Sequence, residues 1–170
     1  MPERVYQVLF LSRRNSARSI MAEALLNRDG RGRFKAASAG VEPMPEIDPL
    51  AIEVMQLAGL PVDRVRPKHY SDFAKAGAAD LDFVFTLSDT AAGEPLPQWP
   101  GLPVTAHWSS PDPVKAEGAE WAKKQAYGRA LSELERRIRI FVNLPFASLD
   151  RISLKAQLDE IGLGKSSHAS

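Results

Sequence analysis

The chain has 170 residues, of which 44% are hydrophobic and 25% are charged, and this composition is typical of a soluble globular protein of one domain. No apolar run approaches the ~18 residues of a membrane span and no signal-peptide core follows the first residues, so we expect a cytoplasmic protein with no membrane partner. The 22 basic and 21 acidic side chains give a formal net charge of +1, which says little about the partner, but the charge outside residues 1–35 is balanced or acidic, so no nucleic-acid partner is expected. Cysteine is absent, which excludes disulfides, thiolate metal sites and a cysteine nucleophile, and we predict no metal site.

The first predicted strand, residues 5–11, is short and apolar and leads through a polar loop into a helix that begins at Ser16 and ends at Gly30. The backbone N–H groups of such a loop and the positive end of the helix dipole converge on a point that suits a tetrahedral oxyanion. Arg18 can add a bidentate guanidinium, and Ser12 lies where an attacking group would stand. The sequence therefore predicts an anion-binding loop at residues 12–18, whose contacts come from Arg13, Arg14, Asn15, Ser16, Ala17, Arg18 and the following Ser19.

Positive charge is concentrated near this loop, because residues 1–35 carry eight basic side chains against three acidic ones. We interpret Arg13, Arg14 and Arg18 as functional and the basic residues of 28–35 as a solvated face. Asn15 suits a left-handed turn, whereas Arg14 would be unfavourable if position 14 required a positive φ. Ser16 and Ser19 can donate hydrogen bonds to the anion or cap the helix.

The rest of the chain alternates apolar strands with amphipathic helices. Strands are predicted at residues 34–41, 81–87 and 102–107, a surface connection with a solvated His69 at 62–73, and a Pro/Gly-rich loop at 88–101. A helix capped by Asp48 and Pro49 should bury Leu50, Val54 and Leu57 before Gly59. A long helix at 118–142 has an apolar stripe, Leu131, Leu134, Ile138, Phe141 and Val142, with Glu133/Arg137 and Glu135/Arg139 pairs beside it. A last helix is predicted from a Ser148 cap to Gly162 and Gly164, burying Leu154, Leu158 and Ile161.

This alternation predicts an α/β fold with a small four-stranded parallel sheet and helices on both faces. We expect one domain over residues 1–164 and a frayed tail at 165–170. Ligands of such folds bind at the carboxyl ends of the strands, which is where Ser12, Ser88 and the loop after His107 are placed.

Several stretches together resemble the low-molecular-weight protein tyrosine phosphatase family and the arsenate reductases that share its fold. They are residues 12–19, Ser19 to Leu26, Ser38 to Val41, Asp48 to Ile52, Phe85 to Asp89, and His107-Trp108 followed by Pro111-Asp112-Pro113, in family order over roughly residues 4 to 145. In that family a cysteine stands at position 12, followed by five residues, an arginine and a serine or threonine. The resemblance implies that Arg18 and Asp112 are catalytic, Asp112 as general acid, and that the loop binds arsenate, phosphate or sulfate.

The resemblance also separates the branches of the family. Tyrosine phosphatases usually carry aromatic residues after the Asp-Pro, whereas Val114 and Lys115 follow here, which favours the arsenate-reductase branch. The resolving cysteines of thioredoxin-coupled reductases would fall at Ser88 and Leu96, so an internal disulfide cascade is excluded. A parent with a cysteine at position 12 would then need an external thiol, such as glutathione with glutaredoxin, or mycothiol, and no other cofactor is implied.

Ser12 decides the activity, because a helix N-terminus and Arg18 can ionise a thiol but not a serine hydroxyl. Either a catalytic cysteine has been replaced, leaving an inactive form that traps its oxyanion, or the natural protein has lost it and acts as an oxyanion sensor or binding module. The otherwise complete set of Asn15, Arg18, Ser19 and Asp112 favours the first explanation. A protein tyrosine phosphatase is the remaining alternative.

Overall fold

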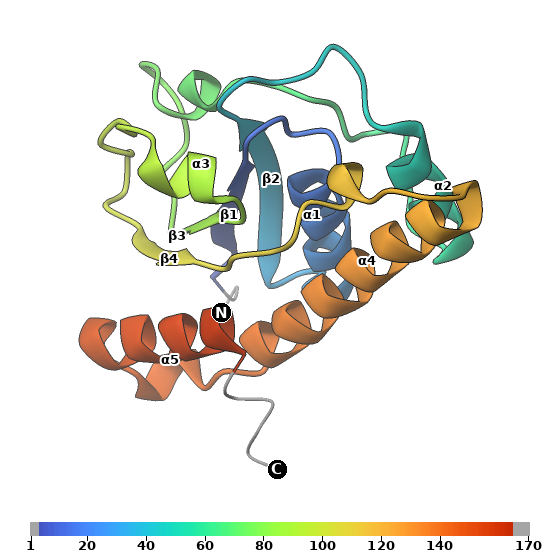
Figure 1. The fold of residues 1–170 in the computed structure, drawn as a ribbon. Coiled ribbons are helices and arrows are strands. Elements are labelled where there is room, and N and C mark those ends of the chain that lie inside the picture. Colours follow the sequence, from blue (N-terminus) through green and yellow to red (C-terminus); the bar gives the residue numbers. More distant parts are fainter. Residues whose placement is uncertain (1–3, 165–170) are drawn as a thin grey trace.

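The computed structural model describes residues 4–164, in which four parallel strands form one sheet in the order β2-β1-β3-β4 (Figure 1). The strands are β1 (Tyr6–Ser12), β2 (Phe34–Gly40), β3 (Phe83–Thr86) and β4 (Val104–His107). In the register, Ser12 lies beside Gly40, Leu11 beside Thr86, and Thr86 beside His107. The carboxyl ends of all four strands therefore meet at one edge, as a parallel sheet requires, and the predicted α/β class is confirmed.

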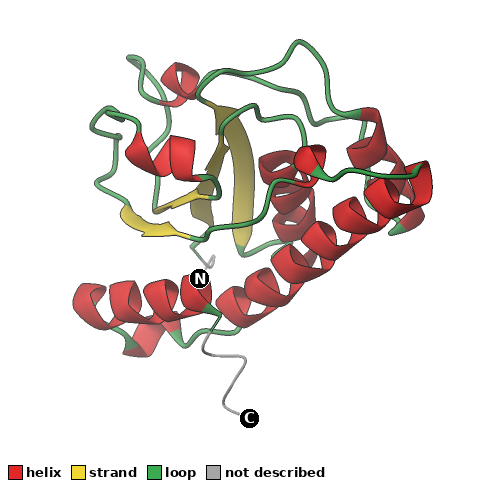
Figure 2. Ribbon diagram, in the orientation of Figure 1, coloured by secondary structure: helices red, strands yellow, loops and turns green. Residues whose placement is uncertain are grey.

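Five α-helices lie in the described chain: α1 (Arg18–Asp29), α2 (Pro49–Leu57), α3 (Asp89–Gly93), α4 (Glu120–Val142) and α5 (Arg151–Leu163). Short 3-10 turns, η1 (Tyr70–Phe73), η2 (Pro113–Lys115) and η3 (Phe146–Ser148), lie in the connections (Figure 2). The division into one domain of residues 1–164 stays a prediction, and the predicted tail at 165–170 falls outside the described residues.

The two central strands, β1 and β3, are buried on both faces, which explains why they are almost continuously apolar, whereas the edge strand β4 alternates between buried and exposed residues. Val8 and Phe10 of β1 point into a large core that they share with α1, α2, α4 and α5. Leu9 and Leu11 point to the other face, where a smaller cluster contains Ala91 of α3 and Trp99. Helices thus cover both faces, but unequally, because the second face is closed mainly by the short α3 and by loops.

Local details of the first half differ from the sequence prediction. The helix α1 begins at Arg18, two residues after the predicted Ser16, because residues 13–17 are held in the loop. Leu57, which was expected to be buried, is exposed, because α2 ends there against open surface, whereas Arg28 is exposed, as expected for the basic residues of 28–35. Residues 89–93 form α3, which was predicted as loop; its N-terminus is capped by the Ser88 hydroxyl, which accepts from the Ala91 N–H at 3.1 Å.

The second half also shows corrected boundaries. The strand β4 starts at Val104 rather than at residue 102, because Leu102 has a φ of +50° and its side chain is exposed. Asp150, not Ser148, caps α5, since its carboxylate accepts from the Ser153 N–H at 2.7 Å. Gly162 does not end that helix; Gly164, with a φ of +74°, does.

Gly162 has a packing role, because α5 lies directly against β4 at this position. A Cβ atom at residue 162 would stand 2.4 Å from the His107 carbonyl oxygen and 2.8 Å from Trp108 Cδ1. The fully buried Trp108 in turn donates from its indole nitrogen to the Leu158 carbonyl at 3.0 Å. The absence of a side chain at residue 162 therefore sets the distance between α5 and the sheet.

Replacing Gly162 by alanine should lower the free energy of unfolding by about 1–2 kcal/mol. Alanine gains up to about 1 kcal/mol of helix propensity, but forcing a methyl group onto fixed backbone costs about 1–3 kcal/mol, and the contact below 3 Å makes the second effect larger. Gly128→Ala is the matched control, since nothing lies within 4 Å of its added Cβ in α4, and it should stabilise the fold. Urea unfolding of both variants measures the difference; equal changes of the same sign would contradict the packing role.

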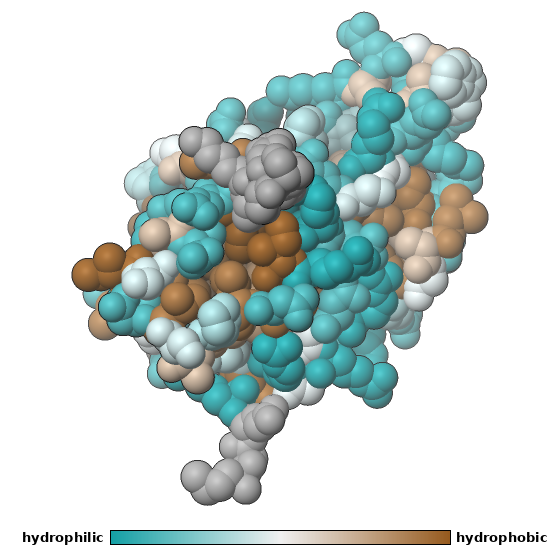
Figure 3. Space-filling view, turned by 90° about the horizontal axis from the view of Figure 1, so that it is seen from below, coloured by the Kyte–Doolittle hydropathy of each residue, from teal (hydrophilic) through white to brown (hydrophobic). Residues whose placement is uncertain are grey.

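The surface below the sheet is uneven in polarity. Seen from below, apolar side chains gather over α5 and in a second patch at the right edge of the view, and much of the remaining face is hydrophilic (Figure 3). Ile152 and Leu163 are the large exposed apolar side chains of α5. Within residues 4–164, no helix combines the length and the apolar character needed to cross a bilayer.

Candidate anion-binding site

The loop between β1 and α1 takes its shape from Asn15. Asn15 has a φ of +49°, while Arg14 does not have a positive φ, so the left-handed residue is the one whose side chain tolerates it best. The loop passes tightly against the end of β2: a Cβ at Gly40 would stand 2.9 Å from the Asn15 Cβ and 3.1 Å from the Arg13 carbonyl oxygen. Gly40 is therefore required for the loop to fold back beside the sheet.

The carbonyl groups of this loop face the segment that follows β2. The carbonyl oxygens of residues 12, 13, 14 and 16 accept hydrogen bonds from the N–H groups of Val41, Glu42, Met44 and Asp48, at 2.8–3.2 Å. By contrast, the N–H groups of residues 13, 14, 16 and 17 have no acceptor within the described chain. A loop with its carbonyls fixed on one side and its N–H groups unpaired is the arrangement that binds an anion.

Ser12 lies at the base of the loop, at the carboxyl end of β1, with 2% of its surface exposed. Its Oγ is 2.6 Å from the Ser19 Oγ and accepts a hydrogen bond from the Asn15 N–H at 3.3 Å. The Asn15 amide donates in turn to the Ser19 Oγ at 2.7 Å and to the Ser38 Oγ at 3.0 Å. These contacts hold the side chain at position 12 in one place, as a reacting group must be held.

A second set of buried polar residues supports the loop from behind. Glu23 of α1 accepts a hydrogen bond from the Ser38 hydroxyl at 2.5 Å, and the Lys68 Nζ lies 4.0 Å from the same carboxylate. The Lys68 N–H donates to the Asn15 Oδ1 at 2.9 Å. Burial raises the pKa of Glu23 and lowers the pKa of Lys68, and in each case the opposite charge of the partner opposes the shift. Each side chain therefore reduces the cost of burying the other.

Arg18 faces Asp112 across the mouth of the loop. The Arg18 Nη1 donates to the Ser110 carbonyl at 2.9 Å, and Nη2 lies 3.6 Å from the Asp112 Oδ2. Burial lowers the pKa of Arg18, and the nearby carboxylate of Asp112 opposes that shift. Asp112 is itself fixed, because its Oδ1 accepts from the Val114 N–H at 3.0 Å and so caps η2.

The structure brings most of the predicted site residues into one small pocket. Its lining consists of Ser12, Arg14, Asn15, Ser16, Ala17, Arg18, Asp112 and Val114. Two predicted contacts lie elsewhere: Arg13 forms an ion pair with Glu42 at 3.1 Å, and Ser19 lies behind the pocket, where it holds Ser12. The pocket combines unpaired N–H groups, a guanidinium, a carboxylate and a hydroxyl, which are groups of the kind that bind tetrahedral oxyanions, and it includes no strong nucleophile.

The positions implied for resolving cysteines carry structural residues. Ser88 caps α3, and Leu96 packs against the smaller core cluster.

His69, predicted as a solvated loop residue, is half-buried and caps η1 by accepting from the Ser71 N–H at 3.1 Å. Within residues 4–164, no group of three or more His, Cys, Asp or Glu side chains could hold a metal ion.

Sequence reasoning missed the residues that hold this pocket from outside. Glu23, Ser38 and Lys68 were not predicted as a unit; the one signal was an acidic residue four positions after Ser19 on a mostly apolar helix. The predicted pair of Arg137 with Glu133 exists as an ion pair at 2.9 Å, but the burial of Arg137 was not predicted. Its Nη1 donates to the Ser109 carbonyl at 2.8 Å, so α4 anchors the segment that carries Ser110 and Asp112.

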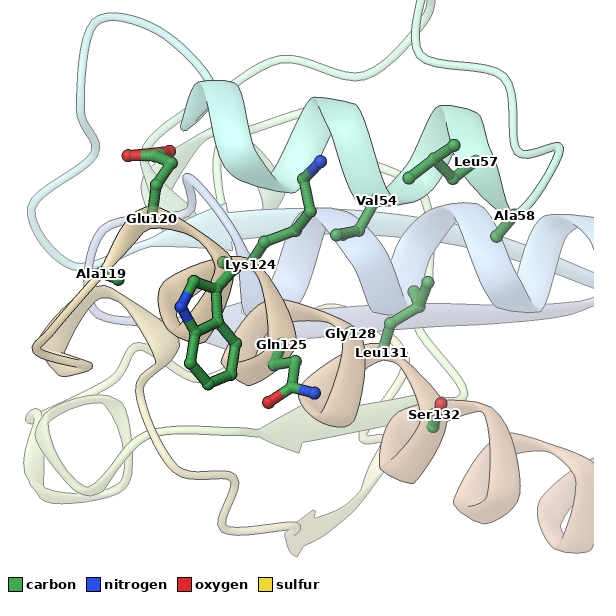
Figure 4. A pocket seen from close by; sticks show the side chains of 11 residues that line it. Val54, Leu57, Ala58, Ala119, Glu120, Lys124, Gln125, Gly128, Leu131 and Ser132 are labelled. Atoms are coloured by element: carbon green, nitrogen blue, oxygen red, sulfur yellow. The ribbon is translucent and has the colours of Figure 1, made fainter.

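A groove of about 890 Å³ lies apart from this chemistry, between α2 and α4 (Figure 4). Val54, Leu57 and Leu131 give it apolar walls, and Lys124 forms an ion pair with Glu53 at 2.8 Å across the two helices. None of the loop residues 12–18 lines this groove.

Comparison with known proteins gives consistent similarities. Residues 7–155 match the family described as low molecular weight phosphotyrosine protein phosphatase. The arsenate reductase of Bacillus licheniformis is 32% identical over 135 residues, 79% of this chain and 93% of that protein. The glutaredoxin arsenate reductase of Synechocystis sp. is 30% identical over 107 residues, 63% of this chain and 78% of that protein. A solved arsenate reductase in the phosphate binding state has the same fold, with a TM-score of 0.64 at 23% identity, covering 81% of this chain and 96% of that one.

Proposed function

The chain belongs to the low molecular weight phosphotyrosine protein phosphatase family, and on this premise we propose that residues 12–18 bind a tetrahedral oxyanion. One observation carries the proposal: unpaired N–H groups of the loop and the buried Arg18 surround the position of Ser12. Backbone dipoles and a guanidinium fork bind arsenate and phosphate in the same way, because both are tetrahedral anions of similar charge. Sulfate shares this shape and enters the proposal as a third ligand.

Within the family we propose an arsenate reductase-like protein whose nucleophile position carries Ser12. Arsenate reductases from two bacteria are 30–32% identical to this chain, and a solved arsenate reductase of the same fold is in a phosphate binding state. The roles we assign are Ser12 at the nucleophile position, Arg18 as clamp and Asp112 as general acid. As it stands, the chain should bind the oxyanion without reducing or hydrolysing it, as an inactive form of an enzyme with a cysteine at position 12.

The electron source of such an enzyme would be an external thiol. Ser88 and Leu96 offer no sulfur for an internal disulfide, so the second electron-donating thiol has to come from another molecule. Glutathione with a glutaredoxin-type protein is supported by the Synechocystis relative, whose name contains that reductant, and mycothiol is the alternative.

A natural binding protein is the second candidate, and Ser12 itself is the observation that favours it. With no cysteine in 170 residues, the chain has no thiol that could form an adduct with the oxyanion. An oxyanion sensor would need only the anion-binding groups of the 12–18 loop. Tyrosine phosphatase chemistry is less well supported, since Val114, not an aromatic side chain, lines the mouth of the pocket.

Phosphate, arsenate and sulfate should each stabilise the folded chain, with no product formed. At about 100 times the dissociation constant the stabilisation is about 2.7 kcal/mol, which for a chain of this size raises the Tm by roughly 5–10 °C. Isothermal titration gives the Kd, and thermal unfolding in chloride of the same ionic strength gives the baseline. A Tm that follows ionic strength alone, with no effect specific to tetrahedral anions, would contradict the proposed function.

A further inference from the structure

Arg14 is a cationic side chain without an assigned partner at the edge of the pocket. It is half-buried, and within the described chain its guanidinium forms no hydrogen bond or ion pair, whereas the adjacent Arg13 is paired with Glu42. Its charge also lowers the pKa of Arg18, which means that the two guanidinium groups repel each other. A partly desolvated cation held near another cation is stabilised when an anion binds between or beside them.

A groove of about 490 Å³ continues from the anion pocket past Arg14. Arg14, Ser16 and Val114 line both spaces, and Met44 and Ile47 add apolar walls to the groove. Inorganic phosphate or arsenate would fill the loop and leave this groove empty. An oxyanion with an organic substituent would place that substituent in the groove, with Arg14 alongside.

Arg14 is the one cationic side chain among the described residues that line this groove, and the lining also contains two carboxylates, Asp48 and Glu46. Asp48 is already engaged, because one carboxylate oxygen accepts from the Leu50 N–H at 2.9 Å and the other from the Tyr127 hydroxyl at 2.6 Å. Glu46 also lines the groove but is exposed, where water and salt screen its charge. Because neither carboxylate forms an ion pair with Arg14, the Arg14 guanidinium is the group of this groove that can bind a second negative group on a ligand.

We propose that the groove binds the organic part of an oxyanion ester that carries a carboxylate, and that Arg14 is the residue that selects for this second charge. The proposal rests on the proposed function, since the ester's oxyanion has to occupy the 12–18 loop. A guanidinium fork matches the two oxygens of a carboxylate, and the apolar walls suit a short hydrocarbon or aromatic linker between the two anionic groups. The chemical class is a small phosphate monoester with a carboxylate substituent.

The test compares 4-carboxyphenyl phosphate, phenyl phosphate and inorganic phosphate by isothermal titration with the full chain, whose Ser12 prevents turnover. We expect the carboxylated ester to bind about tenfold more tightly than phenyl phosphate, the size of effect that one charge-assisted hydrogen-bonded pair produces. Arg14→Gln should reduce this ratio to about one. Arg13→Gln removes the same charge from a residue paired with Glu42 and should keep the ratio, so it controls for general electrostatic attraction.

Arg14→Lys, which retains the charge without the fork, should keep only part of the preference and guards against a folding defect in the glutamine variant. Equal Kd values for the two esters in the original chain, or a preference that persists in Arg14→Gln, would overturn the role of Arg14. In either case binding of inorganic phosphate would leave the proposed function standing. Failure to bind inorganic phosphate would instead overturn the proposed function.

Discussion

Replacing Arg18 by alanine should weaken phosphate binding at least about a hundredfold. The side chain is buried beside Asp112 and Ser110, and the proposed function assigns to its guanidinium two charge-assisted hydrogen bonds to the anion. Each such bond is worth about 1.5–3 kcal/mol, and every 1.4 kcal/mol changes the Kd tenfold. In addition, the variant leaves Asp112 without its cation, so the remaining carboxylate repels the incoming anion.

Isothermal titration with phosphate measures the effect, and the Tm of each variant without ligand provides its own baseline. Arg28→Ala is the matched control, because Arg28 lies near the other end of α1, is exposed and pairs with Asp29 at 2.8 Å. Arg18→Lys should fall between the two, since an ammonium supplies charge without the fork. If Arg18→Ala binds phosphate as tightly as Arg28→Ala does, the anion binds somewhere other than the 12–18 loop.

The fold was predictable because its main signals are local. Continuous apolar runs identify strands that are buried on both faces, and Asp48 followed by Pro49 identifies a helix start that the structure confirms through the bond from the Leu50 N–H. Errors occurred where tertiary contacts override the local pattern. Gly162 has the usual mark of a helix end, yet it remains in α5 because the helix needs a residue without a side chain against β4.

The site was predictable in part for the same reason. Ser12 and Arg18 lie on one loop, so their proximity follows from the chain itself, whereas Asp112, about a hundred residues later, was placed by family resemblance. The buried contacts of Glu23 with Ser38 and Lys68 depend on how α1, β2 and the segment before η1 come together. A spacing of four residues correctly paired Arg137 with Glu133 but carries no information on burial, so its anchoring bond to Ser109 was missed.

The proposed function makes the side chain at position 12 decisive, because a serine and a cysteine differ there by one atom, oxygen or sulfur. In the structure the hydroxyl of Ser12 is held by Ser19 and Asn15, beneath unpaired N–H groups and close to the N-terminus of α1. This environment favours a negative charge and would lower the pKa of a thiol from about 8.5 toward neutrality. A serine hydroxyl is far too basic for the same environment to ionise it, so under the proposed function the loop would bind an oxyanion that Ser12 does not attack.

Ser12→Cys should therefore give arsenate reduction, provided that the serine replaces a catalytic cysteine. The thiolate would attack arsenic, Asp112 would protonate the departing oxygen, and an external thiol would complete the two-electron reduction to arsenite. Because loss of a nucleophile from an otherwise complete site costs on the order of 10⁶ in rate, the recovered activity should exceed that of the serine form by several orders of magnitude.

The assay follows arsenite formation with three reductants: glutathione plus glutaredoxin, mycothiol plus mycoredoxin, and thioredoxin, with hydrolysis of an aryl phosphate measured alongside. We expect reduction with one of the two small-thiol systems, little with thioredoxin because Ser88 and Leu96 supply no resolving pair, and at most slow phosphatase activity. Ser12→Cys combined with Asp112→Asn is the control, and it should lose most of the recovered rate because the leaving oxygen then lacks its acid. If Ser12→Cys binds arsenate but forms no arsenite with any of the three reductants and does not hydrolyse the aryl phosphate, the inactive-enzyme interpretation is wrong. The 12–18 loop would then belong to a protein whose function is to bind the oxyanion.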